Sequence, residues 1–295
     1  PKQLLRGETP RLIDEWQIAP KLWDTIRFEV DHRGELGQFV LTGSAVPADT
    51  HEITHSGTGR FTWLMMRPMS LYESGESNGT VSLKELFEGK EKIEGYADLT
   101  FERLAFVVCR DGWPQAIDMK DEEALKQPRC YYNTYVHSDI NKADNIKKNP
   151  KRVEALMRSY ARSQGSQVPN TVLVHGDLIN DLHTFGFLFE TLCIRDLRIY
   201  ADSLGGEVYH YRDKDGLECD AVIHLRNGKY GLIEIKLGGD TLIEEGARNL
   251  KAMEAKIDTD KMNTPSFLMV LTGVGNYAYR RKDGVFVVPI GSLKN

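Results

Sequence analysis

The sequence predicts an α/β protein in three parts: an α/β core at residues 1–70, a helical region at 71–170, and an α/β domain with a mixed sheet at 171–295. In the first part, two strand-length apolar runs flank a helical pattern. In the second, apolar residues recur at helical spacing. The third has the order helix, three strands, helix, two strands, which is typical of a compact α/β domain. A chain of 295 residues is long enough for this division.

The first part contains a strand, a helix and a second strand. RLIDEWQ and QFVLTGSA each hold a short apolar run. Between them, KLWDTIRFEV places Leu22, Ile26 and Val30 at helical spacing. Polar residues follow both predicted strands, at the end where open α/β sheets usually carry their ligand sites.

The second part is mostly helical. Its helices are predicted over SLKELFEG, LTFERLAFVVCR, DEEALKQPRCYYNTYVHSDI and PKRVEALMRSYARSQGS. We expect Pro128 to kink or break the third of these, because proline lacks the amide hydrogen that a helix interior needs. Pro150 marks the start of the fourth helix and Gly165 marks its end.

The third part begins with a long helix over DLINDLHTFGFLFETLCIRDLRIYADSL, which ends at Gly205 and Gly206. Strands are predicted over EVYHYR, ECDAVIHL and YGLIEIKL. A helix over IEEGARNLKAMEAKI and two strands over SFLMVLTG and VFVVPIG follow.

The composition is that of a soluble globular protein, with 41% apolar and 27% charged residues. The net charge of -5 provides no overall attraction to nucleic acid, so such a partner would need a local basic patch. The four cysteines lie far apart without a CxxC pair, which disfavours a zinc site or a disulfide framework. No apolar run approaches membrane-spanning length. We therefore expect a cytoplasmic protein with no membrane partner.

The turn between ECDAVIHL and YGLIEIKL decides which side chains of these two strands meet. A two-residue turn at Asn227-Gly228 would place the apolar sets of the two strands on opposite faces of the sheet. A three-residue loop, with Gly228 in a left-handed conformation, pairs Leu225 with Lys229 and buries both apolar sets together. We therefore predict the three-residue loop.

The three-residue loop brings charged residues together. Asp220 would face Glu234, and Glu218 would face Lys236. Two carboxylates directly opposite each other repel, and a Mg²⁺ ion between them removes the repulsion because Mg²⁺ prefers oxygen ligands. Lys236 is then placed to orient a water molecule or to stabilise charge at a phosphate. The alternative is a structural hairpin, in which Glu218 pairs with Lys236 while Asp220 and Glu234 point to water.

At these residues the sequence resembles the PD-(D/E)XK superfamily, which has the restriction-endonuclease-like fold. The resemblance consists of a helix with Glu190, a strand with Asp220, and the run from Glu234 to Lys236. It implies that Glu190, Asp220 and Glu234 bind Mg²⁺. It also implies that Lys236 assists a water molecule that attacks a phosphodiester bond. Taken on its own, Glu190 fits a glutamate on a helix surface equally well.

A closer resemblance covers most of the chain. FGFLFETLCIRDLRIYAD, HYRDKDGLECDAV and GLIEIKLGG resemble the C-terminal domain of unknown function, family 4143, of AAA-type ATPases. Near the start of the chain, RLIDEWQ resembles the Walker B strand of these ATPases and LTGSA resembles their sensor strand. The runs GR and RPMSLYE follow in the expected order.

The AAA resemblance implies roles for individual residues. Asp14 would hold the Mg²⁺ of ATP through water, and Glu15 would polarise the attacking water. Thr42 or Ser44 would lie near the γ-phosphate, and Arg60 would contact the nucleotide, in the same subunit or a neighbouring one.

The chain contains no G-x-x-x-x-G-K-[S/T] phosphate loop. Without the backbone amides and the lysine of that loop, these residues alone should bind ATP poorly. We therefore expect residues 1–70 to be part of an AAA-type core whose beginning is missing from the chain.

The resemblances together imply an AAA-type ATP-binding protein fused to a nuclease-like domain that hydrolyses phosphodiester bonds with Mg²⁺. Mg²⁺ and ATP would be its cofactors, and nucleic acid and further copies of the chain its partners. The alternative is a non-catalytic module that binds nucleic acid or protein under the control of nucleotide. Fold similarity does not by itself establish activity.

Overall fold

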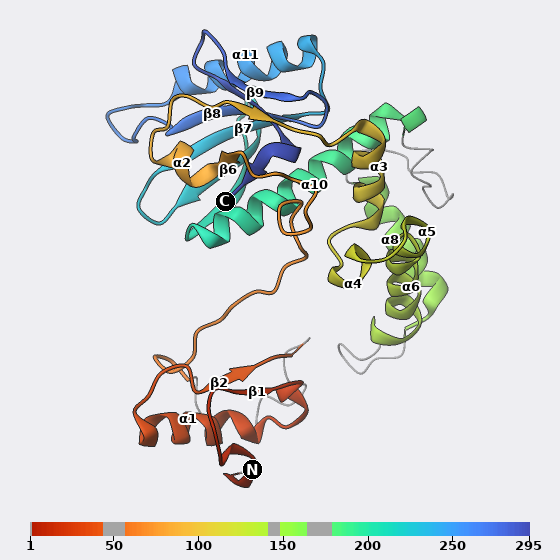
Figure 1. Cartoon of the computed structure of the whole chain (residues 1–295), viewed down its shortest axis with the longest axis vertical. Coiled ribbons are helices and arrows are strands. Elements are labelled where there is room, and N and C mark those ends of the chain that lie inside the picture. Colours follow the sequence, from red (N-terminus) through yellow and green to blue (C-terminus); the bar gives the residue numbers. More distant parts are fainter. Residues whose placement is uncertain (1, 44–56, 141–147, 164–178) are drawn as a thin grey trace. The chain divides into compact units, whose positions relative to one another are not determined.

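The computed structural model describes residues 2–43, 57–140, 148–163 and 179–295. The chain forms two compact units (Figure 1). One comprises Pro1–Met66 and Asn133–Glu154, and the other comprises Arg67–Tyr132 and Ala155–Asn295. Both contain helices and strands, as the α/β prediction requires.

The first unit contains the predicted strand, helix and strand near the start of the chain. The strands β1 (Arg11–Ile13) and β2 (Phe39–Leu41) pair in parallel. Helix α1 (Lys21–Arg33) buries Leu22 and Ile26, which pack with Leu5 of the short helix η1 (Lys2–Leu5). A second short helix, η2 (Trp16–Ile18), precedes α1. The predicted apolar spacing therefore marks the inner face of α1.

The described helices of the middle region follow the predicted ranges, but the first three predicted helices are shorter or divided. They are α2 (Leu83–Phe87), α3 (Phe101–Arg110), α4 (Pro114–Ile117), α5 (Asp121–Ala124), α6 (Lys126–Thr134), the π-helical η4 (Tyr135–Asp139) and α8 (Pro150–Ser163). The predicted break in the third helix falls before Lys126 rather than at Pro128. Pro128 lies in the first turn of α6, where its missing amide hydrogen would have no helical partner in any case. The predicted end of the fourth helix, Gly165, lies outside the described residues.

The second unit, which we call the C-terminal unit, is built on a seven-stranded mixed sheet. The strand order is β4-β9-β10-β8-β7-β6-β5. Its strands are β4 (Gly95–Tyr96), β5 (Gly206–Arg212), β6 (Glu218–Leu225), β7 (Tyr230–Lys236), β8 (Phe267–Thr272), β9 (Tyr277–Arg280) and β10 (Phe286–Pro289). Strands β7, β8 and β10 are parallel, and the other neighbouring pairs are antiparallel. Strands β4 and β9, which form one edge of the sheet, are not predicted from the sequence pattern.

Two helices cover opposite faces of this sheet, α10 (Leu182–Ser203) and α11 (Asp240–Lys256) (Figure 1). On the α10 side, Phe189 and Leu197 pack with Met269 and Leu271 of β8. On the α11 side, residues such as Leu250 pack with Leu268 and Val270 of the same strand. Strand β8 is therefore buried on both faces, which explains its continuous apolar run.

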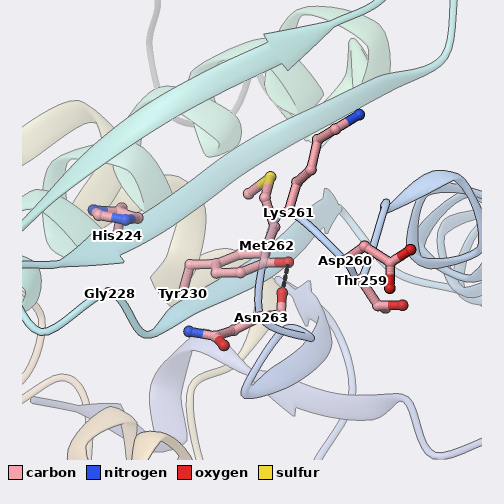
Figure 2. A pocket seen from close by; sticks show the side chains of 8 residues that line it. All are labelled: His224, Gly228, Tyr230, Thr259, Asp260, Lys261, Met262 and Asn263. Atoms are coloured by element: carbon pink, nitrogen blue, oxygen red, sulfur yellow. Dashed lines mark hydrogen bonds between the residues drawn. The ribbon is translucent and has the colours of Figure 1, made fainter.

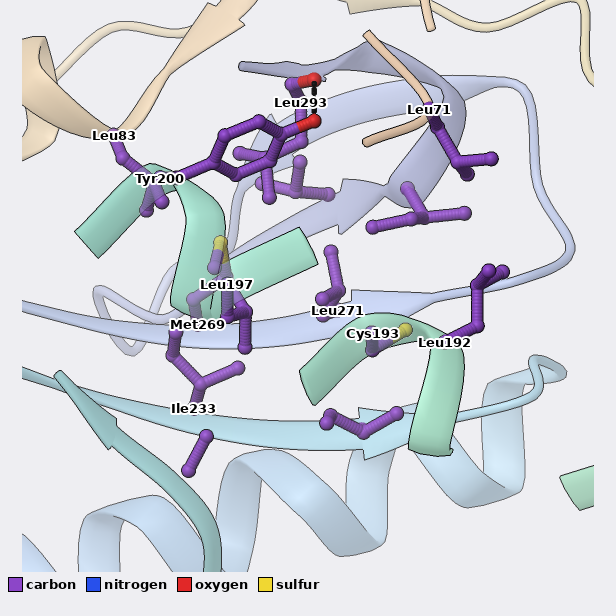
Figure 3. Close-up of a cluster of buried hydrophobic side chains, with 14 of the residues drawn as sticks. Leu71, Leu83, Leu192, Cys193, Leu197, Tyr200, Ile233, Met269, Leu271 and Leu293 are labelled. Atoms are coloured by element: carbon purple, nitrogen blue, oxygen red, sulfur yellow. Dashed lines mark hydrogen bonds between the residues drawn. The ribbon is translucent and has the colours of Figure 1, made fainter. Parts of the chain in front are cut away.

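The core on the α10 side also contains residues from the middle region. Leu71 and Leu83 pack there beside α10, and Tyr200 of α10 donates a hydrogen bond to the carbonyl of Leu293 at 3.3 Å (Figure 3). A two-stranded parallel sheet joins β3 (Val81–Ser82) to β11 (Leu293–Lys294), the last strand of the chain, which follows the short helix η5 (Ile290–Ser292). Part of the region between residues 71 and 110 is thus packed into the same core as the C-terminal sheet.

Candidate functional site

The β6–β7 hairpin has the register that the sequence predicted. Gly228 has a φ of 82°, and its amide donates to the carbonyl of Leu225 at 3.0 Å. The amide of Leu225 donates to the carbonyl of Lys229 at 2.8 Å. The ladder runs from the pair His224 and Tyr230 to the pair Ala221 and Ile233. The three-residue loop is confirmed.

The ladder between β6 and β7 does not continue to Asp220, because β6 contains a bulge there. On β5, Tyr209 pairs with Val222 and Tyr211 pairs with Cys219, so that Asp220 and Ala221 both lie opposite a single residue, His210. Such an extra residue bends a strand and redirects its side chains. Cys219 accordingly packs on the α11 side, whereas Ala221 packs on the α10 side.

The predicted pair of Glu218 and Lys236 is wrong for the same reason. Glu218 pairs with Arg212 on β5. Its carboxylate lies 2.7 Å from Nε2 of His210 and 3.9 Å from Nη1 of Arg212. The contact between His210 and Glu218 joins two neighbouring strands, so it depends on the fold and not on the spacing of the two residues in the sequence.

Asp220, Glu234 and Lys236 form one group of charges, which we call the acid–lysine cluster. Nζ of Lys236 lies 2.7 Å from Oε2 of Glu234 and 3.4 Å from Oδ2 of Asp220. The same Oδ2 accepts a hydrogen bond from the amide of Ile235 at 2.7 Å. The side chains of Glu234, Asp220 and Lys236 are 3%, 16% and 20% exposed. The alternative in which Glu234 points to water is therefore wrong.

Burial and charge shift the pKa values in the cluster. Burial and the charge of Asp220 raise the pKa of Glu234 to about 7, although Lys236 opposes the shift. Burial alone would lower the pKa of Lys236, but the charges of Asp220 and Glu234 outweigh it and raise that pKa. Near neutral pH, a small change in the surroundings therefore decides whether Glu234 is charged.

Two local features hold the cluster at the end of β7. Gly238 (φ 140°) and Gly239 (φ 94°) take the chain from β7 into α11 through conformations that other residues rarely adopt. In α11, Gly246 lies against the cluster, since a β-carbon at this position would be 3.3 Å from Cβ of Glu234 and 3.5 Å from Cγ of Lys236. The absence of a side chain at Gly246 lets the helix approach β7 closely.

Glu190 on α10 is half-buried near this cluster. Burial and the charge of Asp220 raise its pKa. Among the described residues, no three His, Cys, Asp or Glu side chains are grouped so as to hold a metal ion. Glu190 therefore does not form a three-carboxylate group with Asp220 and Glu234 in this structure, and its role as a metal ligand stays a prediction.

A pocket of about 340 Å³ lies at the other end of the hairpin, near the turn (Figure 2). It is lined by residues that include His224, Tyr230 and Met262. The hydroxyl of Tyr230 donates a hydrogen bond to the carbonyl of Asn263 on the facing loop. The pocket is thus separate from the acid–lysine cluster.

In the first unit, two of the residues implied by the AAA resemblance meet. The hydroxyl of Thr42, which follows β2, donates a hydrogen bond to Oδ1 of Asp14, which follows β1. Glu15 has a φ of 51° and its carboxylate accepts a hydrogen bond from Gln17.

Arg60 forms an ion pair with Asp31 of α1, with Nε 2.8 Å from Oδ1. Ser44 lies outside the described residues. Within the described part of the chain, none of the helices combines the length and the apolar character that crossing a membrane requires.

Three family models match parts of the chain. Residues 2–75 match an AAA domain, residues 101–193 match a domain of unknown function (DUF8612), and residues 185–293 match another domain of unknown function (DUF4143). No curated protein and no solved structure matches the chain. The similarity to an AAA domain indicates a nucleotide-binding, ATPase-like function for the N-terminal part. Residues 185–293, which hold the acid–lysine cluster, are similar to a domain whose function is unknown.

Proposed function

We propose that the C-terminal unit hydrolyses phosphodiester bonds of nucleic acid with Mg²⁺, at the acid–lysine cluster. The observation that carries this proposal is the position of Lys236, whose Nζ lies 2.7 Å from Glu234 and 3.4 Å from Asp220 at the end of a sheet. Carboxylates beside a lysine provide both the ligands for a hard cation and a positive charge for a phosphate.

Asp220 and Glu234 fit a Mg²⁺ ion, since this ion is usually held by one or two carboxylates together with water and substrate phosphates. Among the described residues, the amide of Ile235 and Nζ of Lys236 donate hydrogen bonds to Asp220, and both go to Oδ2. Oδ1 is therefore available to a ligand. A bound Mg²⁺ would lower the pKa of a water molecule and offset the charge of a phosphate. Glu234 would bind it in the ionised form, which dominates above a pH of about 7.

Lys236 has two tasks in this proposal. Its ammonium group offsets the repulsion between the two carboxylates and a phosphate. It is also a hydrogen-bond donor that can orient a water molecule or stabilise charge that develops on the phosphate oxygens. The raised pKa of Lys236 keeps the group protonated, and therefore a donor, at neutral pH.

For the N-terminal part we propose binding of ATP, with Asp14 facing the Mg²⁺ of the nucleotide and Glu15 facing the attacking water. The similarity to an AAA domain and the hydrogen bond between Thr42 and Asp14 support this proposal. These residues do not supply a phosphate loop. Arg60 would have to leave its ion pair with Asp31 to reach a nucleotide.

Nicking of supercoiled plasmid and cleavage of branched DNA test the proposal for the C-terminal unit. We expect activity with Mg²⁺ or Mn²⁺ that EDTA abolishes. Lys236→Met should reduce the rate by about 10²–10⁴, the range typical of a positioned proton-transfer or electrostatic group. Lys261→Met, which changes an exposed lysine at the separate pocket, should leave the rate unchanged.

Equal activity of the Lys236→Met variant and the wild type would contradict the proposal, and so would an inactive wild type. Calorimetric titration with Mn²⁺ then distinguishes the remaining functions. Binding that is lost in the Asp220→Ala, Glu234→Ala double variant, without any cleavage by the wild type, would favour the non-catalytic module.

A further inference from the structure

We propose that Tyr96, Tyr277 and Tyr279 form a platform on which unpaired bases of a nucleic-acid strand stack. We call these three residues the tyrosine platform. The inference rests on the proposed function and names its substrate class: nucleic acid with a single-stranded segment next to the bond that is cleaved.

The register of the sheet places the tyrosine platform in line with the acid–lysine cluster. Lys236 pairs with Thr272 of β8, and Thr272 pairs with Pro289 of β10. In the neighbouring row, Glu234 pairs with Val270, and Val270 pairs with Val287. Directly opposed residues in a sheet point to the same face. The rows of Lys236 and Glu234 therefore extend across the α11 face of the sheet.

Strand β9 completes both rows. Tyr279 pairs with Val287 and so belongs to the row of Glu234. Tyr277, two residues earlier on the antiparallel β9, belongs to the row of Lys236, and it pairs with Tyr96 of β4. Ala278 points the other way, into the core on the α10 side. All three tyrosines thus share the face and the sheet end of the cluster.

The three rings lie open to solvent. Tyr277 is 68% exposed, Tyr96 is 46% exposed and Tyr279 is 42% exposed. Helix α11 packs against β6, β7 and β8, which lie on the other side of β10 from the platform. The rings of Tyr96 and Tyr277 meet edge to face with centroids 5.5 Å apart, and Asn276 donates a hydrogen bond to the hydroxyl of Tyr96 at 3.3 Å. These contacts hold the rings of Tyr96 and Tyr277 in place, and helix α11 does not cover the platform.

The distance between the cluster and the platform suits a nucleic-acid strand. Three strand spacings separate β7 from β9, which amounts to about 14 Å. A stacked strand rises about 3.4 Å per nucleotide, so the platform would meet bases about four nucleotides from the cleaved bond. Bases of any sequence stack on tyrosine rings, whereas a duplex keeps its base faces buried between neighbouring pairs.

The turn after β9 provides positive charge beside the platform. Lys282 is exposed on this turn. Arg281, its neighbour, is bonded to Glu244 of α11 at 2.7 Å, and this contact holds the turn on the α11 side of the sheet. A lysine next to aromatic rings matches the backbone phosphates and bases of a single strand.

Fluorescence anisotropy of the full chain with a labelled 15-nucleotide oligo(dT), in EDTA so that no cleavage occurs, tests this inference. We expect the wild type to bind the single strand more tightly than a duplex of equal length. Tyr277→Ala should weaken binding by about 5-fold to 150-fold, the equivalent of about 1–3 kcal/mol for the loss of one stacked base. Tyr277→Phe, which keeps the ring, should bind as the wild type does. Tyr209→Ala, at the opposite edge of the sheet, is the matched control and should have no effect.

Three results would overturn the inference: no binding of oligo(dT), equal affinity for the duplex, or unchanged affinity in a Tyr96→Ala, Tyr277→Ala double variant that retains the circular dichroism spectrum of the wild type. The last result would be expected if the tyrosines contacted a protein instead. Tyr277→Ala in the Lys236→Met background separates this inference from the proposed function, because cleavage should already be reduced by the loss of Lys236 while Tyr277→Ala should still weaken binding by the same factor. Tyrosine-dependent binding without cleavage by the wild type would refute the proposed hydrolysis and retain the platform.

Discussion

At the scale of single residues, Asp220 combines a structural contact with a proposed role in metal binding. Oδ2 accepts a hydrogen bond from the amide of Ile235, at a place where the β6–β7 ladder has ended. The side chain therefore replaces a backbone partner, and a buried amide without a partner costs free energy.

Two substitutions of Asp220 separate these roles. Asp220→Ala should lower the free energy of unfolding by about 1–3 kcal/mol, because the amide of Ile235 loses its acceptor. Asp220→Asn keeps an oxygen acceptor and should cost less, although it removes the charge needed for a cation. Urea denaturation measures both values. Equal stability of the Ala variant and the wild type would contradict the structural role.

The raised pKa of Glu234 predicts that the stability of the chain depends on pH in metal-free buffer. Its pKa is raised from 4.5 to about 7 in the folded chain, so the folded state keeps a proton that the unfolded state releases between these values. The free energy of unfolding should therefore fall as pH rises through this window, by at most about 1.4 kcal/mol per pH unit for one proton. The contribution of Glu234 to stability is therefore greatest below pH 4.5.

The Glu234→Gln variant isolates this contribution, because the amide does not ionise. As the pH rises from 4.5 to 7, the free energy of unfolding of the wild type should fall relative to that of this variant. Denaturation curves in EDTA at several pH values measure it. A difference that stays constant over this range would show that Glu234 is ionised in the folded chain throughout.

At the scale of elements, the contact between α11 and β7 depends on Gly246. A β-carbon there would lie 3.3 Å from Cβ of Glu234 and from Cγ2 of Val270. These neighbours belong to a packed core or to the cluster, so they have little room to move. The helix position and the cluster geometry are therefore linked.

Gly246→Val should destabilise the chain by about 1–3 kcal/mol through overpacking. Gly186→Ala in α10 is the matched control, because a β-carbon at Gly186 would meet no atom within 4 Å. Alanine also favours a helix, so this variant should gain up to about 1 kcal/mol. Thermal unfolding measures both, and a destabilised Gly186 variant or an unaffected Gly246 variant would contradict the packing argument.

At the scale of the whole molecule, a buried polar network joins the RPMSLYE segment to α10 within the C-terminal unit. Oδ2 of Asp196, which is fully buried, accepts a hydrogen bond from the amide of Leu71 at 2.8 Å. Oδ1 of Asp196 lies 2.7 Å from Nη2 of Arg195, which also contacts Asp111. Sequence segments more than 100 residues apart thus share one cooperative core.

Asp196→Ala should reduce the free energy of unfolding by about 3–5 kcal/mol, because it breaks a buried ion pair and leaves the amide of Leu71 without a partner. Hydrogen exchange at Leu71 should accelerate together with that of α10. Asp202→Ala, which removes the exposed partner of Arg67, should cost no more than about 1 kcal/mol. Unchanged protection at Leu71 in the Asp196 variant would show that the segment is held by other contacts.

The sequence by itself determined the α/β class, the order of α10, β5, β6, β7, α11, β8 and β10 along the chain, and the register of the β6–β7 hairpin. These features depend on side-chain periodicity and on the conformations that Gly228 allows, which are local properties of the chain. The same register predicted that Asp220, Glu234 and Lys236 lie together, and Nζ of Lys236 contacts both carboxylates.

Only the tertiary structure decided the bulge at Asp220, the pairing of Glu218 with His210 and the line of residues from Lys236 to Tyr277. The bulge puts Cys219 and Ala221 on opposite faces of the sheet. Both residues are apolar and both faces are buried, so the sequence pattern contains no sign of the bulge. Likewise, the neighbours of β9 and β4 come from distant parts of the chain, and their positions depend on how the whole sheet is assembled.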